Sequence, residues 1–316
     1  MFARGLILTV HYPLRIYEIL RRRPLPVFEH YLIVRIFKLT GSWYPVSLKY
    51  PNPVNGGNGT INLDLDLCQT SQYVYFHRQG QHEVQWISLI GLAMGEDKTF
   101  IDVGAHIGVF TITVAQAFPY QRIVAIEPLL SNYSKLQRNI NSHCLSNVDA
   151  IQGAVTVADG TVKFFENPLN DGGGSLVEPT DYRTGDVVVN ATTYRDKHPE
   201  FSAIHDVSSL ALDHLINGPS VLKIDVEGAE ASVLKSGLES LKTGLVELMV
   251  VEVTTDSVDE VINLVGEAGF DCFIYGCLQP LTSHEDFKLR LDNIVCLRRN
   301  SQSYDAVMAK FAQAAP

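Results

Sequence analysis

Three groups of residues in this sequence have types and spacings that suit chemistry on a small molecule. The first is Asp102-Val-Gly-Ala-His-Ile-Gly108, in which two glycines lie four positions apart after a short apolar run. The second is Glu127-Pro128, which lies 25 residues beyond Asp102. The third is Lys223-Ile-Asp-Val-Glu-Gly-Ala-Glu230. Carboxylates and free backbone N–H groups in such positions bind hydroxyl, ammonium and phosphate groups.

The glycine-containing group predicts a cofactor cradle. Residues 99–103 form an apolar run typical of a strand, and 107–118 are typical of the helix that follows it. Gly104 and Gly108 let a ligand approach the backbone where the N–H groups of a helix N-terminus are free. The spacing is neither that of a dinucleotide fingerprint nor that of a P-loop, which disfavours a nicotinamide-dependent oxidoreductase. Asp102 either receives an ammonium group or caps the helix.

Glu127 extends this prediction to a nucleoside. It follows a second apolar run at 122–126, and an acidic side chain at that strand end can accept hydrogen bonds from both ribose hydroxyls. A site for an ammonium group beside a site for a ribose describes S-adenosylmethionine. The residues that we expect around this cofactor are Asp102, Gly104, Ala105, His106, Gly108, Glu127, Pro128, Asn132 and Ala154.

The third group places a lysine and three acids at the carboxyl end of the apolar run 221–225, the edge at which open α/β sheets bind ligands. Asp225 is interpreted in two ways. It is a base whose pKa is raised by burial, or it binds a divalent metal such as Mg²⁺ together with Glu252 at the end of the run 245–253. The structural alternative is that Asp225 caps the next helix, where Glu227 and Glu230 favour the positive N-terminus.

The elements that must position these groups alternate between strand and helix. Residues 131–143 predict a helix capped by Ser131, and 148–152 predict a third strand. After an interruption, the alternation resumes with 221–225, and it continues with helices at 229–237 and 258–268 and strands at 270–275 and 293–297. This pattern predicts an α/β fold with a parallel sheet.

We therefore divide the chain into three parts. A basic arm and loop (1–60) precede a main domain (61–300) that carries an insertion at 153–215, and a C-terminal tail (301–316) follows. Residues 1–40 contain seven Lys and Arg against two Glu, spaced as two amphipathic helices. Such an arm suits peripheral contact with an anionic membrane. The pattern favours the alternative, an N-terminal helical cap whose apolar face packs on the domain.

The composition excludes some classes of protein. The 316 residues include 35 Asp and Glu against 25 Lys and Arg, a net charge of −10 that disfavours nucleic acid as a partner. Five cysteines without C-x-x-C spacing indicate reduced thiols and a cytoplasmic location. No uncharged run of 18 apolar residues predicts a transmembrane helix.

These three motifs, with Gly174-Ser-Leu176 and Leu212-Asp213, resemble those of the FkbM-type S-adenosylmethionine-dependent methyltransferases. The resemblance covers about residues 72–298, and the Lys223–Glu230 string is its most specific part. It implies a Rossmann-like class I methyltransferase fold, with a seven-stranded, mostly parallel sheet, a final antiparallel strand and helices on both faces. It also implies methyl transfer to a hydroxyl of a sugar, glycolipid or macrolide-like molecule.

The resemblance also bears on the catalytic residues. That family usually has Asn where this chain has His106, so the imidazole either replaces the Asn as a hydrogen-bonding group or reaches the acceptor hydroxyl as a second catalytic candidate beside Asp225. Metal-dependent sugar O-methyltransferases of similar fold place acids at the strand ends occupied here by Asp225 and Glu252, which supports a metal at those positions.

For the acceptor, we expect a pocket drawn from 76–86, the glycine-rich loop 172–175 and 194–205, with Glu83, Ser175 and Glu227 as binding residues. We interpret His205 and His214 as surface or core residues rather than bases, because nothing in their spacing pairs them with a carboxylate. The alternative function is a non-catalytic binding module that retains the fold and docks to a membrane or partner through its N-terminal arm.

Overall fold

The computed structural model describes residues 43–51, 58–66, 69, 71–72, 75, 83–184, 187–198, 203–286 and 291–314. The basic arm at 1–40 lies outside the described residues, so its membrane contact stays a prediction. Most of the predicted acceptor segment before Glu83, including His77 and His82, also lies outside them.

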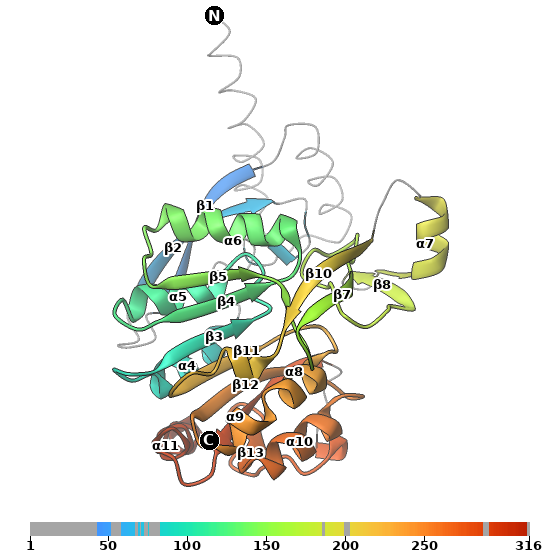
Figure 1. Cartoon of the computed structure of the whole chain (residues 1–316). Coiled ribbons are helices and arrows are strands. Elements are labelled where there is room, and N and C mark those ends of the chain that lie inside the picture. Colours follow the sequence, from blue (N-terminus) through green and yellow to red (C-terminus); the bar gives the residue numbers. More distant parts are fainter. Residues whose placement is uncertain are drawn as a thin grey trace, which may run out of the picture.

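A seven-stranded sheet with the order β13-β14-β12-β11-β3-β4-β5 forms the centre of the fold (Figure 1). Strand β14 is antiparallel to both of its neighbours, and the other pairs are parallel. The predicted mostly parallel sheet with a final antiparallel strand is therefore confirmed. The strands are β3 (Thr99–Val103), β4 (Ile123–Glu127), β5 (Val148–Gln152), β11 (Ser220–Ile224), β12 (Val246–Thr254), β13 (Phe270–Phe273) and β14 (Leu291–Arg298).

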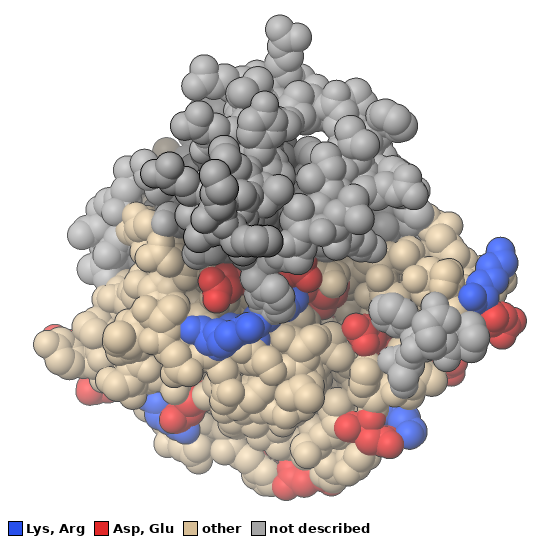
Figure 2. Space-filling model, turned by 90° about the horizontal axis from the view of Figure 1, so that it is seen from above, with Lys and Arg blue, Asp and Glu red and all other residues tan. Residues whose placement is uncertain are grey.

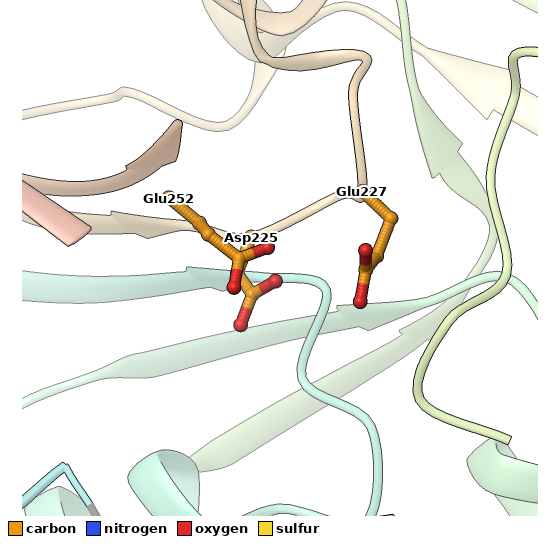
Figure 3. Close-up of side chains that lie close together, drawn as sticks. All are labelled: Asp225, Glu227 and Glu252. Carbon is orange, nitrogen blue, oxygen red and sulfur yellow. The ribbon is translucent and has the colours of Figure 1, made fainter. Parts of the chain in front are cut away.

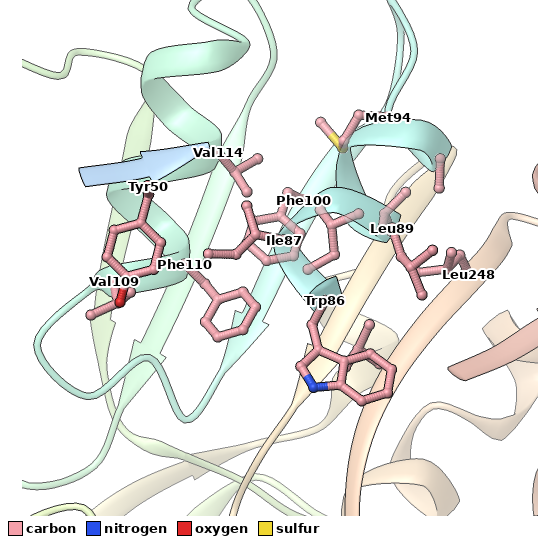
Figure 4. Packing of buried hydrophobic residues seen from close by; sticks show 14 of the residues in the cluster. Tyr50, Trp86, Ile87, Leu89, Met94, Phe100, Val109, Phe110, Val114 and Leu248 are labelled. Carbon is pink, nitrogen blue, oxygen red and sulfur yellow. The ribbon is translucent and has the colours of Figure 1, made fainter. Parts of the chain in front are cut away.

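Helices cover both faces of this sheet, and the side chains of each strand alternate between them. Phe100 and Val221 join a cluster with helices α4 (Val84–Ala93), α5 (Val109–Ala117) and α11 (Gln302–Ala314), part of which Figure 4 shows. Ile101 and Leu222 join a cluster on the other face with α8 (Glu230–Ser236), α9 (Leu238–Lys242) and α10 (Val258–Glu267). Continuous apolar runs form these strands because a parallel strand covered on both sides has no solvated face.

A hairpin and the last helix extend the first cluster. Strands β1 (Trp43–Pro51) and β2 (Asn58–Asp66) pair in antiparallel fashion, so the boundary drawn at residue 60 falls inside this hairpin. Tyr50 of β1 is buried in the same cluster as Val109 and Phe110 of α5 (Figure 4). Helix α11 occupies the segment assigned to a C-terminal tail, and its Val307 and Phe311 are fully buried in that cluster.

Helix α6 (Leu130–Ser142) follows β4, and its start differs from the prediction. Leu129 is the N-cap residue, without a side-chain cap, so the prediction that Ser131 caps this helix is wrong. The Glu127 carboxylate instead accepts a hydrogen bond from the Leu129 N–H. Asn139 of α6 accepts one from the Asp64 N–H of β2 and donates one to the Ile107 carbonyl, which joins the hairpin to the glycine turn.

The insertion at 153–215 builds its own small sheets beside the ends of β3, β4 and β5 (Figure 1). Its elements are β6 (Ala154–Val155), β7 (Gly160–Phe165), β8 (Asp181–Thr184), β9 (Val187–Asn190), α7 (Ala191–Lys197), β10 (Ile204–Leu210) and the turn η1 (Leu212–His214). Strands β6, β10 and β7 form one sheet, and β8 and β9 pair separately. Another short turn, η2 (His284–Asp286), lies near the C-terminus.

The described helices are all too short or too polar to span a bilayer. On the face shown in Figure 2, the visible charged side chains lie in small groups of mixed sign between uncharged surface.

Candidate functional site

A pocket opens at the carboxyl ends of β3, β4, β11 and β12. Parallel strands end at one edge of a sheet, so motifs far apart in the sequence meet there. Residues of the insertion and of the segment between the β1–β2 hairpin and α4 complete the lining. Of the residues predicted for the site, those that line the pocket are Glu83, Gly104, Ala105, His106, Glu127, Pro128, Asn132, Ala154, Asp225, Glu227 and Glu252. Asp102, Gly108 and Ser175 are not among the lining residues.

The glycine turn has a left-handed backbone at Gly104, His106 and Gly108, with φ of 80°, 51° and 94°. A Cβ at Gly104 would overlap the carbonyl oxygen of Asp225, because the turn lies directly on the end of β11. The N–H groups of Gly104 and Ala105 donate to the Ile126 carbonyl at 3.0 and 2.9 Å. Glycine is therefore required at 104 by the close approach of two backbones.

Glu127 is held by main-chain donors from both sides. Its Oε2 accepts from the His106 N–H at 2.9 Å, and its Oε1 accepts from the Leu129 N–H at 3.0 Å. Burial raises the pKa of Glu127, while His106 and these hydrogen bonds oppose the rise. Each carboxylate oxygen can accept a further hydrogen bond, so the group is oriented to bind hydroxyls in the pocket.

Asp102 lies behind the turn, fully buried. Thr111 Oγ1 donates to its Oδ2 at 2.6 Å, and Lys223 Nζ lies 3.6 Å from its Oδ1. Burial raises the pKa of Asp102, and the Lys223 ammonium opposes the rise. The carboxylate thus faces a cation of the protein itself rather than the pocket, in contrast to the ammonium site that its place at the strand end suggested.

Lys223 also influences the pKa of Asp225. Its Nζ lies 3.1 Å from Asp225 Oδ2, donates to the Gly104 carbonyl at 3.1 Å and lies 5.1 Å from the centre of the Phe110 ring. Burial alone would raise the pKa of Asp225, but the Lys223 ammonium and a hydrogen bond with Glu252 outweigh it and lower the pKa. The prediction that burial raises this pKa is wrong, because the lysine two positions earlier points to the same side of the strand.

Three carboxylates converge beside this ion pair. Asp225, Glu227 and Glu252 each offer an oxygen, and these oxygens all lie within 4.8 Å of one another. Figure 3 shows the Asp225 and Glu252 carboxyl groups side by side, with that of Glu227 across from them. Burial and the neighbouring Asp225 raise the pKa of Glu227 to about 8 and that of Glu252 well above its usual value. Glu252 Oε2 is buried without a hydrogen-bond partner.

The sequence predicted that Ser175 binds the acceptor, but its side chain forms hydrogen bonds with the protein backbone instead. Its hydroxyl donates to the Glu227 carbonyl at 2.7 Å and accepts from the Val177 N–H at 3.0 Å. Glu227 has a left-handed φ of 53°. The insertion therefore holds the turn that directs Glu227 toward the other two carboxylates. Glu227 is a third possible ligand, which the metal hypothesis from sequence did not include.

Asp171 is the site residue that sequence reasoning missed. Its buried carboxylate accepts hydrogen bonds from Ser71 and Gln72, lies 3.2 Å from Lys135 Nζ and lies 3.4 Å from His106 Nε2. Burial would raise its pKa, but His106, Lys135 and the hydrogen bonds hold the pKa well below its usual value. Its position before the triple glycine was the only local signal.

Asp171 also bears on the alternatives for His106. The imidazole lines the pocket, and its Nε2 lies 3.4 Å from the Asp171 carboxylate without a hydrogen bond among the described residues. This contact favours a role within the protein over contact with the acceptor. The Asn132 amide donates to the Asp171 carbonyl at 2.8 Å and fixes the same loop from α6.

Other residues that the sequence predicted to bind the acceptor do not line the pocket. Trp86 is buried in the core, and none of the described residues of 194–205 lines the pocket. The two histidines interpreted as surface or core residues have partly or largely exposed side chains, and the fold brings each beside an acid that is distant in the sequence. His205 Nε2 lies 2.8 Å from Glu166, and His214 Nδ1 lies 3.2 Å from Asp159.

Comparison with known proteins identifies a family whose sequence model the chain matches. The model of the methyltransferase FkbM domain matches residues 102–272. The chain is 31% identical over 163 residues to Methyltransferase 1 of Beauveria bassiana (strain ARSEF 2860), covering 50% of this chain and 65% of that protein. It is 28% identical over 189 residues to Methyltransferase sdnD of Sordaria araneosa, covering 54% and 73%. The match thus spans just under two thirds of the Beauveria protein.

A solved structure is similar at lower identity. Methyltransferase FkbM from Methylobacillus flagellatus KT matches with a TM-score of 0.42 and 12% identity, over 65% of this chain and 44% of that chain.

Proposed function

This chain belongs to the FkbM methyltransferase family, and we propose that it transfers a methyl group from S-adenosylmethionine to a hydroxyl of a sugar, glycolipid or macrolide-like small molecule. One observation carries the proposal. A single pocket joins the glycine turn and the main-chain-held Glu127 carboxylate to three carboxylates at the ends of β11 and β12.

The cofactor end of the pocket fits S-adenosylmethionine. The Glu127 carboxylate is oriented by two N–H donors and binds the ribose hydroxyls. The apolar lining of Ala154, Val155 and Phe164 buries the adenine, and Gly104 allows the turn to lie against the end of β11 beside it. When bound, the cofactor supplies an electrophilic methyl group on its sulfonium. The residues of the chain contribute mainly orientation and exclusion of water, because in-line displacement depends on alignment of the reacting atoms.

The acceptor end must assist a hydroxyl, which is a weak nucleophile. The Asp225 carboxylate is already paired with the Lys223 ammonium, so it accepts a proton poorly but remains available as a ligand. We therefore favour Asp225, Glu227 and Glu252 as ligands of a divalent cation such as Mg²⁺, which prefers oxygen donors. The buried Glu252 Oε2 without a partner fits such an ion. When bound, the ion would polarise the acceptor hydroxyl.

Thermal unfolding with S-adenosylhomocysteine, and with NAD as the control ligand, tests the cofactor. At about 100 times its Kd, the first ligand stabilises by about 2.7 kcal/mol and raises the Tm by a few degrees. Glu127→Gln should reduce this shift, and Glu267→Gln, at an exposed position on α10, should keep it. Absence of any shift with S-adenosylhomocysteine would refute cofactor binding and favour the non-catalytic module. Incubation with methyl-labelled S-adenosylmethionine and panels of hydroxylated, amine and carboxylate acceptors then tests O-methylation.

A further inference from the structure

The end of β3 already holds a cation that belongs to the protein. The Lys223 Nζ lies 3.6 Å from Asp102 Oδ1, 3.1 Å from the Gly104 carbonyl oxygen and 3.1 Å from Asp225 Oδ2. Lys223 is buried on β11. Its displacement would leave buried carboxylates without a counter-charge, which is strongly destabilising. An ammonium group of a bound cofactor therefore needs another carboxylate.

Glu83 offers that carboxylate in the same pocket. It is the N-cap residue of α4, and its main-chain carbonyl accepts the N–H groups of Trp86 and Ile87. An N-cap side chain ordinarily turns back to bind N–H groups of its own helix, but the Glu83 side chain makes no such bond. Its backbone has a left-handed φ of 59°, uncommon for a residue with a side chain, and the residue lines the pocket.

Glu83 lines the same pocket as Gly104 and His106 of the glycine turn. Its carboxyl group feels the charges of Lys223, Asp225, Asp102 and His106. Burial raises the pKa of Glu83 to about 7, although the positive charges of Lys223 and His106 oppose the rise. The other acids that line the pocket are engaged. Asp225 pairs with Lys223, Asp171 pairs with Lys135, Glu127 binds two N–H groups, and Glu227 and Glu252 form the cluster with Asp225.

We propose that Glu83 binds the ammonium group at the amino-acid end of the cofactor, in place of Asp102. The inference rests on the proposed function, since it assumes that S-adenosylmethionine occupies this pocket. It replaces the acceptor-binding role that the sequence suggested for Glu83. A carboxylate–ammonium hydrogen bond in a buried site is both strong and directional.

Calorimetric binding of two ligands tests this assignment without turnover. One is S-adenosylhomocysteine, and the other is its des-amino analogue, which keeps the adenosine, thioether and carboxylate and lacks only the ammonium. The unaltered protein should bind the first about tenfold to a hundredfold more tightly, as a charge-assisted hydrogen bond provides. Glu83→Gln should remove most of this preference by weakening S-adenosylhomocysteine alone. Glu267→Gln, at an exposed position on α10, should keep it.

The outcomes separate the two proposals. If Glu83→Gln folds with an unchanged Tm and keeps the full preference, another group binds the ammonium and the inference is wrong. If Glu83→Gln weakens both ligands equally, Glu83 only shapes the pocket, which also overturns it. If the unaltered protein binds neither ligand, the proposed cofactor itself is wrong and the inference falls with it.

Discussion

Lys223 and Asp225 form an ion pair of 3.1 Å in which the lysine is buried, and the ammonium of this lysine also faces Asp102 at 3.6 Å. One cation thus balances two carboxylates from neighbouring strands. Removing the lysine leaves both buried carboxylates without a counter-charge, which destabilises the fold strongly. The intact ion pair stabilises it much less, because burying the pair removes both charges from water. Substitution of Lys223 should therefore affect both the stability of the fold and the arrangement of the site.

Lys223→Met should lower the free energy of unfolding by about 3–5 kcal/mol, because it keeps the aliphatic bulk but removes the counter-charge. Urea unfolding at neutral pH measures the loss. Lys235→Met is the control, since the Lys235–Glu260 pair is about half exposed and should contribute less than about 1 kcal/mol. Equal, small losses in both variants would show that the buried ion pair is not required.

Asp171→Asn should destabilise the protein at neutral pH by about 2–3 kcal/mol, because the carboxylate balances Lys135 and accepts hydrogen bonds from Ser71 and Gln72. The pKa of Asp171 is lower in the folded chain than in the unfolded chain, where Asp titrates near about 3.9. Its stabilisation is therefore present above that value and is lost as the pH falls toward the folded pKa.

Urea unfolding at pH 7 and at pH 3 checks this sign. The difference between the unaltered protein and Asp171→Asn should be smaller at pH 3. Asp206→Asn, which breaks an exposed pair with Lys163, should change the free energy of unfolding by less than about 1 kcal/mol at both pH values. A difference at Asp171 that stayed constant or grew at low pH would contradict the proposed charge balance.

Gly104→Ala should destabilise the fold by more than about 3 kcal/mol and abolish the S-adenosylhomocysteine-induced rise in Tm. The added methyl group meets the backbone of Asp225, which cannot move without shifting β11, and the left-handed φ of 80° adds strain. Gly218→Ala is the control, because nothing lies within 4 Å of its Cβ position, and should remain within about 0.5 kcal/mol. A fully stable, ligand-binding Gly104→Ala protein would refute the close backbone approach.

Mg²⁺ should raise the Tm of the protein, and Glu227→Gln should remove this effect, because it takes one of three oxygen ligands away. Without Mg²⁺ the same substitution should not lower the Tm, since it relieves repulsion among three adjacent carboxyl groups. Asp256→Asn, at an exposed position after β12, should keep the Mg²⁺ effect. If EDTA and Mg²⁺ leave both Tm and methyl transfer unchanged, the cation is not part of the site.

The local pattern of residues determined much of this protein by itself. The hydrophobic pattern identified 99–103 and 148–152 as strands with the bounds observed in β3 and β5. Strand β3 is covered on both faces and is therefore mainly apolar, whereas β5 lies at the edge of the sheet and leaves Asp149 and Gln152 exposed. The motifs at Asp102, Glu127 and Asp225 marked the strand ends, and strand ends of a parallel sheet share one edge whatever the rest of the chain does.

Only the tertiary structure decided which partner each of these groups meets. Asp102 faces Lys223 rather than the pocket, and Asp171, from the insertion, meets His106 of the glycine turn. The neighbouring Lys223 and a hydrogen bond with Glu252 of β12 lower the pKa of Asp225, although burial at the strand end predicted the opposite. Strand formation depends on neighbours along the chain, whereas the charge and hydrogen bonding of a buried group depend on atoms within a few ångströms, which folding brings from distant positions.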